Sequence, residues 1–281
     1  APARPLAAPA PLAASGAGRV LLSGGSPTHY GRVSLLDTGD PLAPSEQAAL
    51  RVSTPSGAPA LAGVPPQPGQ PGALLRLGDR LVLSNRGLGL QSLAFAALAA
   101  GAGSPDFVAF PPAGQPPETF TAIAAASGRL LAIGGRGLTL HAVEDLAPIA
   151  TAAVDGTPLA LAVAPLAGRT LALVAAGLPG GVQIFEVRES TLERVARILT
   201  GCAATRLAVD AAIERAWVAC SNGRLLPLDL ARSDGLQTLD RDGDGRDDRL
   251  AGAVQLGVNP RALAIDAARS VGLGAARPEG L

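Results

Sequence analysis

Five aspartates lie within nine consecutive residues, in the segment DRDGDGRDD that runs from Asp240 to Asp248. Counted from Asp240, carboxylates occupy positions 1, 3, 5 and 9, and Gly245 at position 6 permits a sharp turn. Such carboxylates can converge on one hard cation, and the backbone carbonyl at position 7 adds another oxygen. Calcium prefers an all-oxygen set of this kind in a flexible loop. The predicted Ca²⁺ ligands are Asp240, Asp242, Asp244, Arg246 through its carbonyl, and Asp248.

This loop is not an EF-hand, because position 12 is Ala251 and no helical pattern leads into it. The segment instead resembles the calcium loops of FG-GAP repeats and integrin-like propellers, which implies the same ligand roles. Those families usually carry several such loops, whereas this chain has one. We expect a structural ion, since no candidate base or nucleophile accompanies the loop; the alternative is a solvated acidic turn. Asp247 has no ligand role and is expected to face solvent or a neighbouring arginine.

A unit with a leading arginine, an apolar run, a Gly-containing turn and a second apolar run recurs along the chain. GRLLAIGGRGLTLHAVED from Gly128 and GRTLALVAAGLPGGVQIFEV from Gly168 are two copies. The leading arginines are spaced by 40 to 61 residues, which brackets the length of about 40–50 residues of a four-stranded propeller blade. They are Arg19, Arg80, Arg129, Arg169, Arg215 and Arg269. We interpret them as structural, capping turn carbonyls or pairing with acids of the adjacent blade.

The pattern predicts an all-β fold, a β-propeller of four-stranded antiparallel blades. We expect about six blades, in an incomplete ring or as part of a larger one. The continuous apolar runs at 130–133 and 171–174 indicate strands buried on both faces. A β-sandwich is the alternative. Residues 190–200 fit either a short helix or, from their place in the repeat, a strand.

Two units, RLAVDAAIERAWVACSNGRLLPLDL and PRALAIDAARSVGLGAA, resemble bacterial YVTN or NHL-type propeller repeats. The resemblance covers most of residues 18–281 and implies a propeller fold. Functions within those families are diverse, so it implies no particular activity.

Cys202 and Cys220 flank a predicted hairpin whose turn lies near residues 211–214. This places both sulfurs at the same end of two antiparallel strands, within reach of a disulfide. One bridge is expected; the alternative is two buried thiols. Trp217, in the same hairpin, is expected in the core.

Composition limits the function classes. The 281 residues carry 23 basic and 23 acidic side chains, and only 2% are aromatic, which argues against nucleic-acid binding. No apolar run reaches the length of a membrane span, so any membrane attachment would be through lipid or a partner. Residues 1–17 read as a Pro/Ala-rich N-terminal spacer before a propeller domain at 18–281. We therefore expect a mature secreted, periplasmic or cell-surface protein.

Two functional hypotheses follow. The first is a calcium-stabilised interaction or structural module, a subunit of an extracellular or periplasmic assembly with a protein partner. The alternative is a propeller enzyme, a metal-dependent hydrolase or lactonase with a site in the central channel. Four aspartates predicted at strand ends are its candidate residues: Asp37, Asp155, Asp210 and Asp266. His29 and His141 are expected to be surface or hydrogen-bonded residues rather than catalysts.

Overall fold

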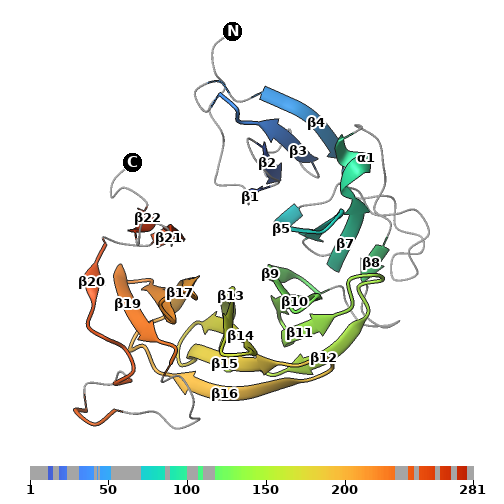
Figure 1. Cartoon of the computed structure of the whole chain (residues 1–281). Coiled ribbons are helices and arrows are strands. Elements are labelled where there is room, and N and C mark those ends of the chain that lie inside the picture. The colour runs from blue at the N-terminus through green and yellow to red at the C-terminus, as the bar shows by residue number, and fades with distance from the viewer. Residues whose placement is uncertain are drawn as a thin grey trace. The chain divides into compact units, whose positions relative to one another are not determined.

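The structure is a computed structural model. It describes residues 12–14, 19–23, 32–40, 43, 45–51, 71–85, 89–99, 107–109, 118–231, 240–243, 247–256, 260–266 and 271–276. Within those ranges the strands form five four-stranded sheets and one two-stranded sheet (Figure 1). Strands that follow one another in the chain are neighbours in each sheet. None of the helices among these residues is long and apolar enough to cross a membrane.

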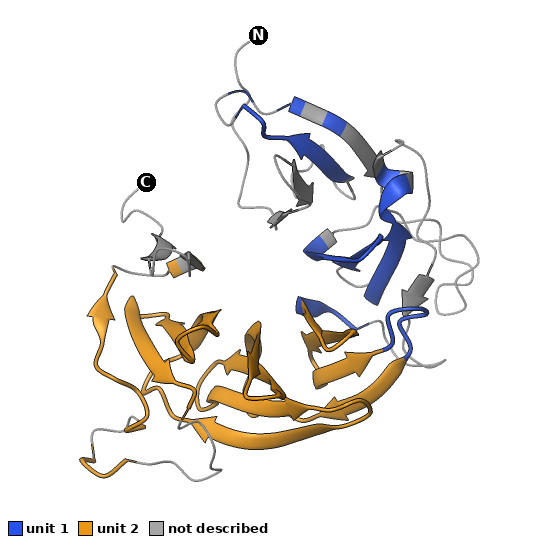
Figure 2. Ribbon diagram, in the orientation of Figure 1, with its two compact units in different colours: residues 1–123, 142–147 blue, residues 124–141, 148–281 orange. Residues whose placement is uncertain are grey.

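The chain divides into two compact units (Figure 2). Unit 1 comprises residues 1–123 and 142–147. Its first sheet consists of β1 (Leu12–Ala14), β2 (Arg19–Ser23), β3 (Arg32–Asp37) and β4 (Ser45–Arg51). Its second sheet consists of β5 (Pro71–Leu77), β6 (Arg80–Asn85), β7 (Gly89–Ala94) and β8 (Phe107–Ala109), with α1 (Phe95–Ala99) between the last two. Strand β1 lies within residues 1–17, so the first sheet begins inside the predicted spacer.

Unit 2 comprises residues 124–141 and 148–281 and holds the other sheets, except for the first residues of β9 and the turn at 142–147. One sheet contains β9 (Phe120–Ala126), β10 (Arg129–Gly134), β11 (Gly137–His141) and β12 (Pro148–Ala152). The next contains β13 (Pro158–Leu166), β14 (Arg169–Ala176), β15 (Gly181–Val187) and β16 (Leu192–Ile198). The last two contain β17 (Ala204–Asp210), β18 (Arg215–Cys220), β19 (Arg224–Asp229) and β20 (Val254–Gln255), and then β21 (Pro260–Asp266) and β22 (Val271–Ala276).

Continuous apolar runs produce β10 and β14, as predicted. Residues 130–134 of β10 and 171–176 of β14 are buried without interruption. A strand that is covered on both faces needs apolar side chains at every position, not at alternate ones. Within residues 190–200, which also fit a helix, Leu192–Ile198 form β16, an outer strand with exposed charged positions.

Tight turns join the first two strands of neighbouring sheets. Ser127 and Gly128 connect β9 to β10, and Ala167 and Gly168 connect β13 to β14. All four residues have positive φ, between 46° and 78°. Two central residues of positive φ define the type I′ turn, whose twist matches that of the flanking strands. The second position is glycine in both turns because it adopts this conformation without steric cost.

Small side chains allow the first strands in unit 2 to approach one another. Strand β13 packs against β17, and β17 packs against β21. Buried alanines at 160, 164 and 204 lie in a core that extends over β13–β19. Unit 1 has its own core, in which Val33, Leu35 and Leu81 are fully or almost fully buried.

Candidate functional site

The acidic loop lies between β19 and β20, in the long connection that the repeat predicts. Of the predicted ligands, Asp240, Asp242 and Asp248 are described, whereas Asp244 and Arg246 lie outside the described residues. Asp240 Oδ1 accepts a hydrogen bond from the Gly243 amide at 2.8 Å, and Asp248 Oδ2 accepts one from the Arg241 amide at 3.3 Å. In the part of the chain that the structure describes, no three His, Cys, Asp or Glu side chains are grouped to hold a metal ion.

A buried ion pair fixes the C-terminal end of this loop. Asp247 and Arg249, with side chains 0% and 2% exposed, form a two-pronged salt bridge. Arg249 Nε donates to Asp247 Oδ1 at 2.7 Å, and Nη2 donates to Oδ2 at 2.6 Å. The expectation that Asp247 faces an arginine is therefore confirmed, but the pair is buried rather than solvated.

The same two residues connect the loop to β16 and the residue that follows it. Arg249 Nη2 also donates to the backbone carbonyl of Arg197 at 3.1 Å. The Asp247 amide donates to the carbonyl of Leu199 at 2.9 Å. These bonds satisfy backbone carbonyls at the end of an outer strand, where the sheet itself supplies no partner.

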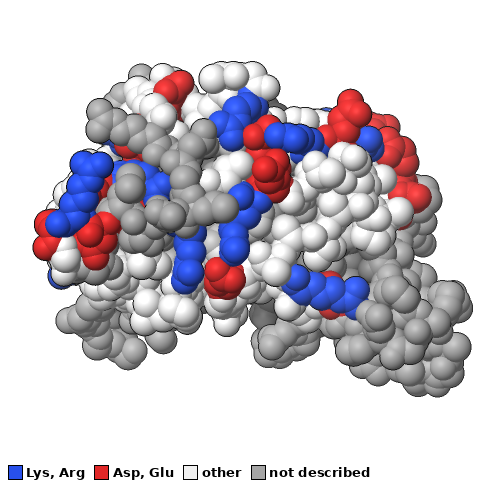
Figure 3. Space-filling model, turned by 90° about the horizontal axis from the view of Figure 1, so that it is seen from below, with Lys and Arg blue, Asp and Glu red and all other residues white. Residues whose placement is uncertain are grey.

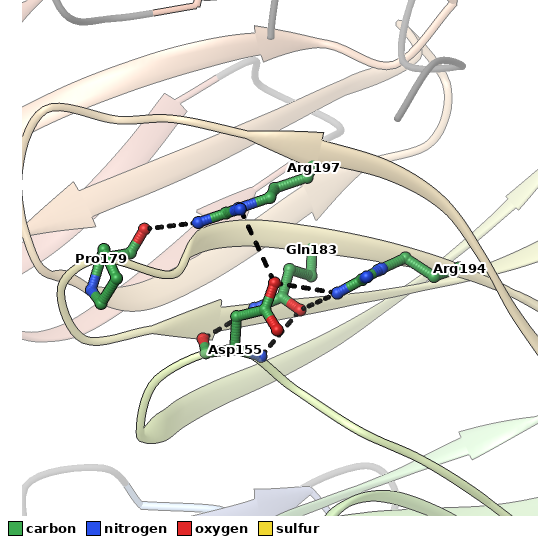
Figure 4. Close-up of polar contacts among 5 residues, drawn as sticks. All are labelled: Asp155, Pro179, Gln183, Arg194 and Arg197. Atoms are coloured by element: carbon green, nitrogen blue, oxygen red, sulfur yellow. Dashed lines mark hydrogen bonds and ion pairs between the residues drawn. The ribbon is translucent and has the colours of Figure 1, made fainter. Parts of the chain in front are cut away.

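Unit 2 also carries a polar network that sequence reasoning missed (Figure 4). Asp155, in the connection between β12 and β13, accepts a hydrogen bond from Arg194 Nη1 at 2.9 Å. Arg197 Nη1 lies 3.8 Å from the same Asp155 oxygen, and Arg197 Nη2 donates to the carbonyl of Pro179 at 3.2 Å. The three charged side chains are between 34% and 41% exposed. One carboxylate thus faces two guanidinium groups at a half-exposed surface.

Gln183 holds this network in place from the buried side of the sheet. Its side chain is fully buried in β15. Gln183 Oε1 accepts from the Asp155 amide at 3.0 Å and from Arg194 Nη1 at 3.2 Å. Gln183 Nε2 donates to the Asp155 carbonyl at 2.9 Å. Because a buried amide must find partners for both its ends, Gln183 fixes the position of Asp155.

A β-bulge explains why the two arginines act together. Residues three apart in a regular strand point to opposite faces. Between β15 and β16, however, Ile184 pairs with Ala196 and Phe185 pairs with Arg194, so Val195 is an extra residue. This insertion places Arg194 and Arg197 on the same side of the sheet. Spacing alone would have separated them.

The remaining candidates have structural partners. The predicted disulfide between Cys202 and Cys220 is present, with Cα atoms 5.8 Å apart. His141 is buried, and its Nε2 lies 2.8 Å from Thr139 Oγ1. Trp217 was expected in the core and is only partly buried, because its position on β18 lies between the inward-facing Ala216 and Val218. His29 and the side chain of Asp266 lie outside what the structure describes.

The other aspartates of the enzyme hypothesis hold turns. Asp210 is buried, and its Oδ1 accepts a hydrogen bond from the Ala212 amide at 3.1 Å. Asp37 accepts from the Gly39 amide and from Gln47 Nε2, both at 2.8 Å. Among the described residues, no hydrogen bond or ion pair joins Asp37, Asp155 and Asp210 to one another.

Two of the repeated arginines show what these positions do. Arg169 pairs with Glu186 and Arg80 Nε donates to Ser92 Oγ, each partner lying on the third strand of the arginine's own sheet. Hydrogen bonds from Arg188, and then from Arg169, hold the pKa of Glu186 below its ordinary value of 4.5. The structural role is thus supported, and these bonds run within a sheet, not to the adjacent one.

Solved structures resemble the chain over most of its length at low identity. The β-propeller domain of Cps50 (Swd1) from Myceliophteria thermophila has a TM-score of 0.64 and 13% identity over 92% of this chain and 76% of that chain. Dihydro-heme d1 dehydrogenase NirN, in complex with DHE, has a TM-score of 0.57 and 15% identity over 88% of this chain and 48% of that chain. Apo AztD from Citrobacter koseri has a TM-score of 0.52 and 12% identity over 93% of this chain and 66% of that chain. The chain folds as a β-propeller.

Likeness at this level shows the fold alone. The chain spans about half of NirN and about two thirds of AztD. No protein-family model matches the sequence, and no curated protein matches it either. Membership of the YVTN or NHL families and the FG-GAP nature of the acidic loop therefore stay predictions.

Positive and negative side chains are mixed on the face that Figure 3 draws. Figure 3 views the molecule from the side on which β16 lies in Figure 1, and its blue and red side chains are interspersed with uncharged residues. A mixed surface of this kind favours short-range pairing with a complementary partner over long-range attraction.

Proposed function

We propose that this propeller is a secreted, periplasmic or surface-exposed protein-interaction or structural module whose acidic loop is stabilised by calcium. The observation that carries the interaction role is the network of Asp155, Arg194 and Arg197. Its two arginines lie on the outer strand β16, its side chains are half-exposed, and buried Gln183 holds Asp155 and Arg194 in one geometry. A protein partner is the class of ligand that such a surface fits.

The energetic reason is preorganisation. Interface hot spots are enriched in arginine, whose planar group makes several directed hydrogen bonds. Ordering a long side chain on binding costs about 0.5–1.5 kcal/mol, and Arg194 already makes hydrogen bonds to Asp155 and Gln183. Since one carboxylate is shared by two guanidinium groups, the network retains positive charge for a partner.

We expect the substitution Arg194→Gln to weaken binding of a specific protein partner. The immobilised chain would be mixed with the secreted and envelope fractions of its source organism, and the captured proteins quantified by mass spectrometry. A protein captured by the wild type should fall about tenfold with Arg194→Gln, as for loss of one charge-assisted hydrogen bond. Arg224→Gln removes an exposed arginine at the start of β19 and is the control. Identical capture by the wild type and both variants would argue against an interaction role for this network.

The residues of the acidic loop fit a hard divalent cation. Asp240 and Asp242 are exposed and Asp248 is one-third exposed, so their carboxylates are open to an ion from solvent. Their donor atoms are carboxylate oxygens, and the predicted contribution of Arg246 is a carbonyl oxygen. The buried pair of Asp247 and Arg249 fixes one end of the loop. When bound, the ion would supply positive charge that offsets repulsion among the aspartates.

Chelation is therefore expected to lower the melting temperature. An ion present at one hundred times its dissociation constant stabilises the folded chain by about 2.7 kcal/mol, which corresponds to about 5–10 °C for a domain of this size. Differential scanning calorimetry with calcium and with EGTA measures the change. Asp242→Asn should abolish the response, whereas Asp79→Asn, which neutralises an exposed aspartate elsewhere, should retain it. An identical melting temperature in calcium and EGTA would remove the metal from the proposal.

A further inference from the structure

An open hollow of about 310 Å³ lies in unit 2, where the β9–β10 turn, the β13–β14 turn and the end of β15 meet. Its volume is at the lower end of the range for small-ligand sites, about 300–1,000 Å³. The Asp155 network borders the other ends of these strands, near the β14–β15 turn. The hollow is thus a separate feature from that network.

Two hydroxyl groups lie at one side of the hollow. Ser127 Oγ and Thr170 Oγ1 are 2.7 Å apart and join two neighbouring sheets. Each hydroxyl carries one hydrogen, and one of the two donates to the other. The accepting hydroxyl therefore keeps its own hydrogen for another acceptor. The type I′ turn that precedes β10 fixes Ser127 in this position.

Two of the arginines that line the hollow are paired with glutamates. Glu186 Oε2 accepts from Arg169 Nη2 at 2.8 Å, and Oε1 accepts from Arg188 Nε at 3.1 Å. Arg188 also pairs with Glu193. Three arginines and two glutamates, Glu186 and Glu189, line the hollow, and two of these arginines, Arg169 and Arg188, have carboxylate partners.

Arg129 is the arginine without a carboxylate. No hydrogen bond or ion pair of its guanidinium group is present within the described ranges, and it lines the same hollow. It begins β10 beside the turn that carries Ser127. A guanidinium group and a hydroxyl donor are thus available together, and both can bind one anionic oxygen pair.

We propose that this hollow binds a single carboxylate, the side chain of a glutamate or aspartate of a protein partner. Arg129 pairs with the carboxylate, and the hydroxyl pair of Ser127 and Thr170 donates a hydrogen bond to it. This assignment rests on the proposed interaction role and specifies the chemistry of the partner.

The charge of the hollow favours a carboxylate over a phosphate. The single guanidinium group of Arg129 can pair with one negative charge, whereas a phosphate dianion would bring a second charge close to Glu186 and Glu189. Like charges at such distances oppose binding. Inorganic phosphate is therefore expected to bind more weakly than a peptide carboxylate.

NMR titration of the full chain tests the inference. The probes are the peptide Ac-Gly-Gly-Glu-Gly-Gly-NH₂, its glutamine counterpart and inorganic phosphate, followed through the backbone amides of Ser127 and Thr170. We expect saturable shifts with the glutamate peptide, weaker binding of phosphate and no saturation with the glutamine peptide. Arg129→Gln should weaken binding of the glutamate peptide about tenfold. Arg129→Lys should restore part of the affinity, because it keeps the charge.

Arg215→Gln is the matched control, since Arg215 begins β18 as Arg129 begins β10 and does not line the hollow. The affinity of the Arg215→Gln protein for the glutamate peptide should stay within about twofold of the wild-type affinity. Equal binding of the glutamine peptide, tighter binding of phosphate, or unchanged affinity of a folded Arg129→Gln protein would each overturn the assignment. Capture that depends on Arg194 but no peptide binding would refute the carboxylate site and leave the interaction role intact.

Discussion

Replacing Arg249 with methionine is expected to lower the free energy of unfolding by about 3–5 kcal/mol. The substitution leaves the Asp247 carboxylate buried, with its two charge-assisted hydrogen bonds from Arg249 removed. It also removes the hydrogen bond from Arg249 to the Arg197 carbonyl at the end of β16. Urea denaturation followed by circular dichroism measures the loss, as a lower midpoint at an unchanged slope.

Arg241→Met is the matched control. Arg241 lies in the same loop and is 84% exposed, and its Nε is 3.9 Å from Asp248 Oδ2. Exposed pairs contribute about 0–1 kcal/mol, so this variant should unfold almost as the wild type does. A double variant, Asp247→Leu with Arg249→Met, should regain part of the loss because it leaves no buried charge. Equal stability of Arg249→Met and Arg241→Met would contradict the anchoring role.

Removal of the disulfide is expected to cost about 3 kcal/mol of unfolding free energy. Cys202 and Cys220 are 18 residues apart in sequence, and the bridge restricts the unfolded chain over that length. Both residues are buried, at 5% and 0% exposure, so the double variant Cys202→Ala with Cys220→Ala also loses some packing. Guanidinium denaturation of the oxidised wild type and the double variant measures the difference.

Reduction separates the two contributions. The reductant should lower the free energy of unfolding of the wild type and leave that of the double variant unchanged. The reduced wild type should then be less stable than the oxidised wild type and more stable than the double variant, because it keeps the packing of both cysteine side chains. Ser221→Ala, next to Cys220 and exposed, controls for substitution at this hairpin end. If the reductant shifted the wild type and the double variant equally, the bridge would not be a source of stability.

The arrangement of strands followed from the sequence to a large extent. Arg19, Arg80, Arg129, Arg169 and Arg215 each begin the second strand of a sheet, as the repeat predicts. The pattern succeeds because burial of a strand on both faces requires a continuous apolar run, which is visible in the residues themselves. Pairing of Cys202 with Cys220 was predictable for a similar reason, since a short hairpin fixes both ends.

The polar network was not predictable, because its geometry depends on long-range register. Asp155 and Arg194 are 39 residues apart, and the extra residue Val195 decides which side of β16 each arginine occupies. A weak signal was present in Gln183, an amide within the otherwise apolar run GVQIF. Likewise, the acidic stretch gave no indication that Asp247 is buried, because its partner carbonyls belong to Arg197 and Leu199.

The alanine-lined approach of β13 to β17 and of β17 to β21 has an evolutionary consequence. Strands that meet at close range restrict side-chain size, whereas the exposed positions of an outer strand such as β16 carry no such steric limit. Substitutions should therefore vary more in side-chain size on the periphery than in the interior. Solved propellers that share this architecture with the chain at only 12–15% identity are compatible with that division.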